Sequence, residues 1–207
     1  MQRYSYLWFL LGLIGMLIVA PIAQRRALGD FVHQGLFTIV VLLALNTVSE
    51  PGARRIAAVV FAAGWLIISW IYLLFGVPGV HVPAGSILFC LFALVMYNIL
   101  LLLFRTRETD ANIMSAAIAA YLMLGVAWAV SFDIIERIAP GSFQGLAQAP
   151  GWSEFLYFSM GTLTTVGYRD MTPTNPSVGI WATLEAACGV LYIAVLISHL
   201  VARVRRH

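Results

Sequence analysis

The chain has 207 residues, of which 61% are hydrophobic and 10% charged. A soluble domain carries about 25% charged residues, so the composition excludes an ordinary soluble protein and indicates an integral membrane protein. All 12 basic residues are arginines, and no basic surface with interleaved aromatic residues is evident, which argues against a nucleic-acid partner.

Six apolar windows are long enough to span a membrane, which requires about 20 residues. In chain order they are residues 5–24, 31–49, 56–76, 83–104, 111–135 and 177–202. The first window also resembles a weak secretory signal, but its length and its initial aromatic residues favour a retained helix. The predicted fold class is therefore an all-α membrane protein with six transmembrane helices.

We divide the chain into a four-helix transmembrane region, residues 1–107, and a second domain, residues 108–207. A voltage sensor needs several arginines within one span, yet the fourth window has none, since Arg105 and Arg107 lie beyond its end. The first four helices are thus predicted to form a peripheral bundle that lacks an ordinary voltage sensor.

A shorter apolar segment, residues 152–163, lies between the last two windows. A helix of this length is about 18 Å long, too short to cross a hydrocarbon core of about 30 Å. The segment is therefore predicted to be a re-entrant helix, with Ser153 as its cap and Glu154 in its first turn. The partly negative C-terminal end of this helix would point inward and favour a cation.

A polar string follows this helix, and such backbone is tolerated at membrane depth only where protein or water surrounds it. A glycine within the string permits unusual dihedral angles, so carbonyl oxygens can be directed at a common axis. Four copies around that axis would replace the water shell of a cation. The string consists of Thr164, Thr165, Val166, Gly167, Tyr168, Arg169 and Asp170.

The segment Phe158–Tyr168, followed by Asp170 and Pro173, resembles the pore helix and selectivity filter of potassium channels, and it is most similar to the small bacterial pore-domain family. The resemblance covers residues 111–203 and includes Leu184–Tyr192 of the inner helix. It implies a homotetramer that conducts potassium passively, with K⁺ held by the filter residues Thr165, Val166, Gly167 and Tyr168. It implies no enzymatic activity, no cofactor and no small-molecule substrate.

Arg169 replaces the second glycine of the family pattern Thr-Val-Gly-Tyr-Gly-Asp. That glycine adopts a conformation that would cost another residue about 1–2 kcal/mol per subunit. Four guanidinium groups would also repel an approaching cation, although Asp170 or Glu154 of a neighbouring subunit is available to pair with Arg169. Three outcomes stay open: conduction with the arginines turned outward, a weakly selective filter, or a non-conducting channel-like subunit.

The inner helix contributes two gating candidates, Glu185 and Gly189. Glu185 either tunes the pore electrostatically or is a buried carboxyl, protonated or hydrogen-bonded to the pore helix. Gly189 matches a glycine that the family is held to use as a gating hinge, or it permits close helix packing. Thr164 and Glu154 are predicted to support the pore helix.

The distribution of arginines predicts that both termini are cytoplasmic in a bacterial inner membrane. Eight would then lie inside, where the C-terminal ones would touch anionic lipids. These are Arg3, Arg54, Arg55, Arg105, Arg107, Arg203, Arg205 and Arg206. The four outside would be Arg25, Arg26, Arg137 and Arg169.

Overall fold

A computed structural model describes residues 5–23, 29–48, 52–77, 79–106, 110–147 and 151–204. The elements, in chain order, are α1 (Ser5–Ala23), α2 (Gly29–Thr47), α3 (Ala53–Phe75), α4 (His81–Arg105), α5 (Ala111–Ile138), β1 (Phe143–Gln144), α6 (Trp152–Leu163), β2 (Thr172–Pro173) and α7 (Pro176–Val204).

Six of the helices are long and apolar enough to cross a membrane. They agree with the six predicted windows to within three residues at either end, and α6 coincides with the predicted short helix. The all-α membrane fold class is thus confirmed. The two-residue strands β1 and β2 were not predicted from the sequence.

Local sequence determines where two of the long helices begin. The Asp110 carboxylate accepts a hydrogen bond from the Ile113 backbone N–H at 2.8 Å, and Asn175 Oδ1 accepts one from the Val178 N–H at 3.0 Å. Each side chain thereby satisfies a backbone donor that lacks a partner within the helix. Pro176 occupies the first position of α7, where a missing N–H costs nothing.

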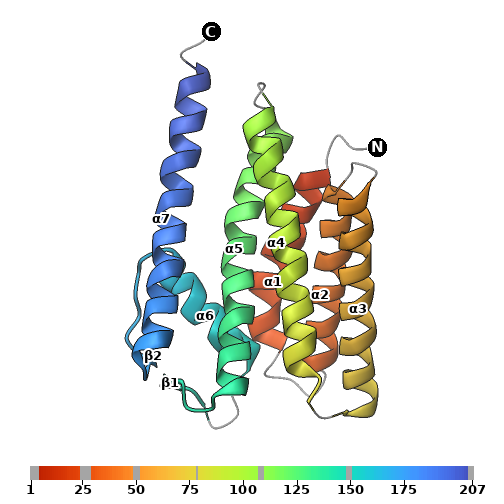
Figure 1. The fold of residues 1–207 in the computed structure, drawn as a ribbon, viewed down its shortest axis with the longest axis vertical. Helices are drawn as coiled ribbons and strands as arrows, with labels where there is room; N and C mark the ends of the chain where they lie inside the picture. Colours follow the sequence, from red (N-terminus) through yellow and green to blue (C-terminus); the bar gives the residue numbers. More distant parts are fainter. Residues whose placement is uncertain are drawn as a thin grey trace. The chain divides into compact units, whose positions relative to one another are not determined.

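The chain forms two compact units, Met1–Met123 and Leu124–His207, and the division lies within α5. In the first unit α1 packs on α2, α2 on α3, and α3 on α4 (Figure 1). Polar side chains join α2 to α3: Gln34 Nε2 donates to Ser69 Oγ at 2.6 Å, and Trp70 Nε1 donates to Thr38 Oγ1 at 3.1 Å. Such interhelical bonds contribute about 0.6 kcal/mol each on average.

In the second unit α6 lies between residues 124–138 of α5 and the helix α7 (Figure 1). An aromatic cluster fills the space between α5, β1 and α6. Phe143 is its centre and contacts Phe132, Phe155 and Phe158 edge to face, with ring centroids 5.7, 5.8 and 5.3 Å away. This geometry is the one that aromatic quadrupoles favour, so the cluster fixes α6 beside α5.

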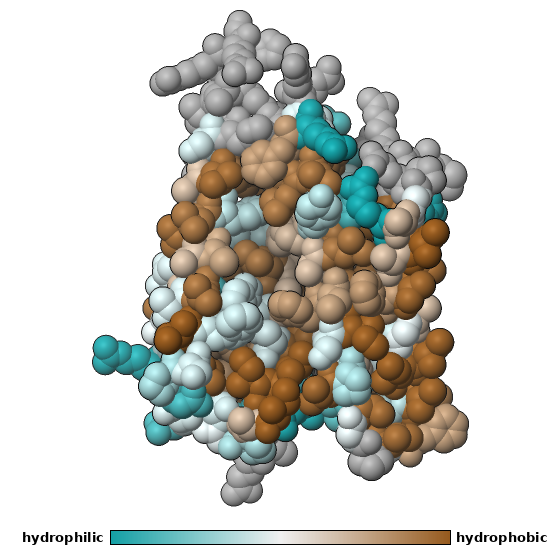
Figure 2. Space-filling view, viewed as in Figure 1, coloured by the Kyte–Doolittle hydropathy of each residue, from teal (hydrophilic) through white to brown (hydrophobic). Residues whose placement is uncertain are grey.

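Large apolar side chains remain exposed along all six long helices. Figure 2 shows hydrophobic residues in brown on one face. Hydrocarbon, unlike water, is a favourable environment for such a surface. The predicted orientation relies partly on arginines outside the described residues. These are Arg3, Arg25, Arg26, Arg107, Arg205 and Arg206.

Two glycines of α1 provide a matched test of packing in the first unit. A Cβ on Gly12 would lie 2.6 Å from Leu43 Cδ1 of α2, whereas one on Gly15 meets no atom within 4 Å. We expect Gly12→Val to lower the free energy of unfolding by about 1–3 kcal/mol through overpacking, and Gly15→Val to change it much less. Thermal unfolding in detergent measures both, and equal effects would contradict this packing.

Candidate functional site

The helix α6 begins two residues earlier than its predicted cap requires. Gly151 is the N-cap and makes no side-chain capping bond, so the prediction that Ser153 caps the helix is wrong; Ser153 lies in the first turn. Glu154 is in the first turn as predicted. One carboxylate oxygen of Glu154, Oε2, is buried without a hydrogen-bond partner among the described residues.

The C-terminal end of α6 is bonded to the chain that follows it. The N–H groups of Thr164, Thr165 and Gly167 donate to the carbonyls of Met160, Thr162 and Gly161 at 3.1, 2.9 and 3.1 Å, respectively. The Thr164 hydroxyl also donates to the Met160 carbonyl at 2.7 Å. Carbonyls at the C-terminal end of α6, which have no partner within the helix, thereby bind the backbone amides of the polar string.

The backbone of the string has positive φ at alternate residues. Thr165 has φ 60° and Gly167 φ 64°, and Thr165 is the one non-glycine residue with positive φ in the described part of the chain. Alternating signs of φ turn successive peptide groups the same way, whereas an ordinary strand alternates them. Within the described residues, no hydrogen bond uses the carbonyl oxygens of residues 165–168.

Tyr168 is held by the outward side of α6. Its ring stacks on Tyr157 with centroids 4.9 Å apart, and a Cβ on Gly161 would lie 3.0 Å from the Tyr168 ring. Tyr157 and Gly161 thus link the tyrosine of the string to one helix.

A two-stranded sheet fastens the chain beyond the string. Phe143 and Gln144 of β1 pair with Pro173 and Thr172 of β2, respectively. A Cβ on Gly145, where φ is +84°, would lie only 1.8 Å from the Asp170 carbonyl oxygen, so this approach requires glycine. The loop after α5 therefore holds the C-terminal end of the string.

Arg169 is exposed and does not have positive φ. The strain expected from replacing the family glycine is therefore absent at this residue, because the backbone has relaxed into an ordinary conformation. No acid of the described chain lies within ion-pair distance of Arg169. Pairing of Arg169 with Asp170 or Glu154 of a neighbouring subunit stays a prediction.

The helix α7 touches the rest of the site along one stripe. Trp181 Nε1 donates to Ser131 Oγ of α5 at 3.0 Å. One turn later Glu185, fully buried, is hydrogen-bonded to Ser159 of α6. One turn further, a Cβ on Gly189 would lie 2.3 Å from the Leu163 carbonyl oxygen. This geometry gives Gly189 a close-packing role, while its use as a hinge stays a prediction.

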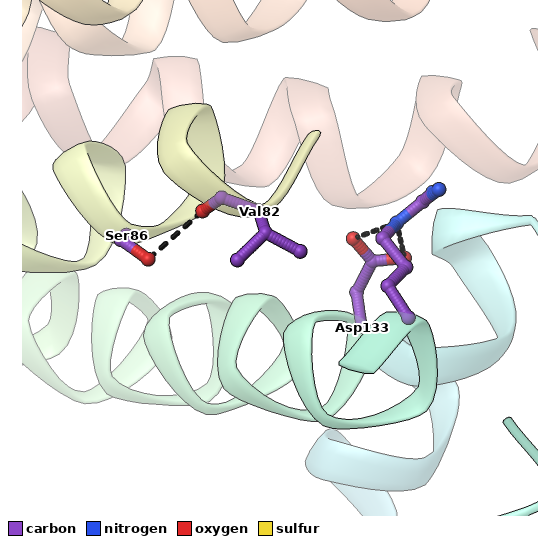
Figure 3. A network of polar contacts seen from close by, with 4 residues as sticks. Val82, Ser86 and Asp133 are labelled. Atoms are coloured by element: carbon purple, nitrogen blue, oxygen red, sulfur yellow. Dashed lines mark hydrogen bonds and ion pairs between the residues drawn. The ribbon is translucent and has the colours of Figure 1, made fainter. Parts of the chain in front are cut away.

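An ion pair closes the last turn of α5. Arg137 Nε donates to both carboxylate oxygens of Asp133, at 3.0 and 2.8 Å, and dashed lines mark these bonds at Asp133 in Figure 3. The partners are four residues apart on one helix face, where such a pair stabilises by about 0.3–0.5 kcal/mol. The charge of Arg137 at this helix end is therefore paired within α5.

Residues 116–206 match a family model described as "Ion channel". The matched segment contains α6, the string, α7 and most of α5. This part of the chain is similar to ion channels and not to enzymes, and we call it the pore domain. By this similarity α6 corresponds to the pore helix, α7 to the inner helix, and residues 165–168 to the filter.

The pore domain is also similar to a curated relative. The inward rectifier potassium channel Kirbac3.1 of Paramagnetospirillum magnetotacticum is 34% identical over 90 residues, which is 42% of this chain. The similarity spans 28% of the length of that relative. No solved structure matches the chain significantly.

Sequence reasoning missed several residues that build the pore domain. Ser159 and Gly125 lie beneath Glu185, while Tyr157, Gly161 and Gly145 position the filter and its outer end. Only spatial proximity shows these roles, because each partner is distant in the chain or is a common residue in apolar helices. The sequence signal for the contact between α6 and α7 was the equal spacing of four residues, from Ser159 to Leu163 and from Glu185 to Gly189.

Two glycines of α7 test the contact between inner helix and pore helix. In Gly189→Ala the new methyl group meets a backbone carbonyl that has no flexible end to yield, so we expect a loss of about 1–3 kcal/mol in the free energy of unfolding. Gly179→Ala on the same helix meets no atom within 4 Å and should be neutral or slightly stabilising. Thermal unfolding of the purified protein in detergent compares them, and a neutral Gly189→Ala would refute the close contact.

Proposed function

We propose that four copies of this chain form a passive, potassium-selective pore in which backbone carbonyls of Thr165, Val166, Gly167 and Tyr168 bind K⁺. The alternation of φ along these residues carries the proposal, because it suits carbonyls that all face one axis. The carbonyls also have no protein donor among the described residues. A dehydrated cation is the partner that satisfies such oxygens at membrane depth.

The similarity to a relative named as a potassium channel supports potassium as the permeant ion. The inner end of the filter adds the Thr165 hydroxyl to the carbonyls. No other ligand or cofactor is part of the proposal, since ion passage requires no chemical step.

A homotetramer explains exposed apolar groups that belong to the filter. Val166 is 57% exposed and Tyr168 52% exposed in one chain, although both follow a re-entrant helix. Equivalent surfaces of neighbouring copies would cover these side chains, as closed rotational symmetry requires. The apolar face of α7 near the axis would be covered in the same way.

The proposed setting is a bacterial inner membrane with both termini in the cytoplasm and Arg169 and Asp170 at the outer mouth. The unequal distribution of arginines supports this orientation. The basic C-terminal residues would then lie near anionic lipid headgroups. No described span among α1–α4 contains an array of several arginines, so the proposed channel is not gated by an ordinary voltage sensor.

Ion flux into liposomes tests selectivity. We expect the purified protein to admit K⁺ at least about tenfold faster than Na⁺, a difference of about 1.4 kcal/mol in barrier height. Gly167→Ala should abolish selective flux because φ 64° costs alanine about 1–2 kcal/mol per subunit. Gly179→Ala serves as the control. Equal K⁺ and Na⁺ flux, or none, would refute the proposal.

Arg169 provides a second test, through its charge. Four guanidinium groups about 10 Å from an ion raise its energy by about 0.4 kcal/mol each in water, before screening. We expect Arg169→Gln to raise K⁺ flux about threefold to tenfold at low ionic strength, and less at high ionic strength. Arg169→Lys, which keeps the positive charge at this position, is the control. A gain that is independent of salt would show that charge is not the cause.

A further inference from the structure

The buried hydroxyl of Ser159 lies within hydrogen-bonding distance of two oxygens, and each of the two contacts needs a hydrogen atom. Ser159 Oγ is 2.7 Å from the carbonyl oxygen of Gly125 on α5, and it is also hydrogen-bonded to Glu185 Oε1 on α7. Ser159 and Glu185 are each 0% exposed. Three helices of the pore domain therefore meet at one hydroxyl group.

A count of protons decides how these groups are bonded. A serine hydroxyl has one hydrogen, and a carbonyl oxygen accepts but never donates. If Ser159 donates to Gly125, the remaining contact needs a hydrogen from Glu185, which only the neutral carboxyl has. The two contacts are filled together by one chain of bonds, from the Glu185 O–H to Ser159 and from the Ser159 O–H to Gly125.

An ionised Glu185 is poorly accommodated at this position. Its single hydrogen bond would come from Ser159, which would then release Gly125, and Oε2 has no partner among the described residues. The titratable groups nearest along the packed helices are Glu154 and Tyr157 on α6, Asp133 on α5, and Cys188 and Tyr192 on α7. Asp133 is already paired with Arg137, and none of these groups is a cation.

We propose that Glu185 is a proton-binding site of the pore domain, and that its bound proton holds α7 and α5 against the pore helix. The neutral carboxyl is the donor that completes the link between the three helices. Loss of the proton breaks the bond to Gly125 and leaves a charge buried between them. The site is thus a switch whose ligand is H⁺, and its effect on conduction rests on the proposed channel function.

The switch lies one turn from the inner end of the filter. Ser159 and Leu163 are four residues apart on α6, and Glu185 and Gly189 are four apart on α7. The Ser159–Glu185 and Leu163–Gly189 contacts therefore join the same two helices at successive turns. Leu163 immediately precedes Thr164, where the filter begins. Weakening the Ser159–Glu185 contact therefore disturbs the Leu163–Gly189 contact, which lies next to the filter.

The sign of the pH dependence follows from this arrangement. A group that binds its proton more tightly in the folded state than in the unfolded state stabilises the fold at low pH, and this contribution disappears as the pH rises. Thermal stability is thus expected to fall with rising pH from the range in which a glutamate of the unfolded chain ionises, and to level off once Glu185 itself ionises, which is where K⁺ flux falls. Raising the pH, not lowering it, weakens the site.

Infrared spectroscopy of the full chain in lipid, titrated from about pH 7 to about pH 10, tests proton binding directly. We expect a carbonyl stretching band of a protonated carboxylic acid at neutral pH that disappears in Glu185→Gln and persists in Asp30→Asn, which changes an exposed acid of α2. The band should shift in Ser159→Ala and keep its position in Ser159→Thr, since threonine retains the hydroxyl. A missing band at neutral pH would overturn the proposal.

Flux and stability over the same pH range test the switch. Wild-type K⁺ flux should fall at least threefold as the carboxyl band disappears, whereas Glu185→Gln, whose amide donates to Ser159 without ionising, should show no such fall. A band that persists to the highest pH, or a fall shared by Glu185→Gln, would overturn the switch. Because infrared and thermal measurements need no ion flux, a protein that binds the proton but conducts nothing contradicts the proposed function and not the proton site.

Discussion

The central constraint on this pore domain is that backbone polar groups at membrane depth must have partners. The amides of Thr164, Thr165 and Gly167 find theirs at the end of α6, while the carbonyls of residues 165–168 find none among the described residues. The amides and the carbonyls can face different sides because the sign of φ alternates along residues 165–168. The same backbone is thus bonded to protein through its amides, and its carbonyls are available to the ion that we propose.

Two glycines on the neighbouring helices and one serine hydroxyl hold the pore helix in position. Gly125 of α5 and Gly189 of α7 let neighbouring helices approach α6, the first against Met160 and the second against the Leu163 carbonyl. Ser159 lies between them and is bonded to both sides. Since these contacts are close to Thr164, where the polar string begins, the packing contacts adjoin both the proposed proton site and the proposed ion site.

The sequence sufficed for the helices, because windows of about 20 apolar residues report directly on span length. The short helix before the polar string was also predictable, as was the first-turn position of Glu154. The strands were not, because the pairing of β1 with β2 depends on contacts across almost thirty residues rather than on strand length. The Ser153 cap was wrong for a related reason: the chain enters α6 at Gly151, and local propensity alone does not fix that turn.

The polar string is fastened at its N-terminal end by α6 and at its C-terminal end by the β1–β2 pair, and Arg169 lies between the two attachments. Arg169 does not have positive φ, so its backbone makes no demand for glycine. The charge of this exposed side chain can therefore be exchanged without strain in the backbone on either side of it.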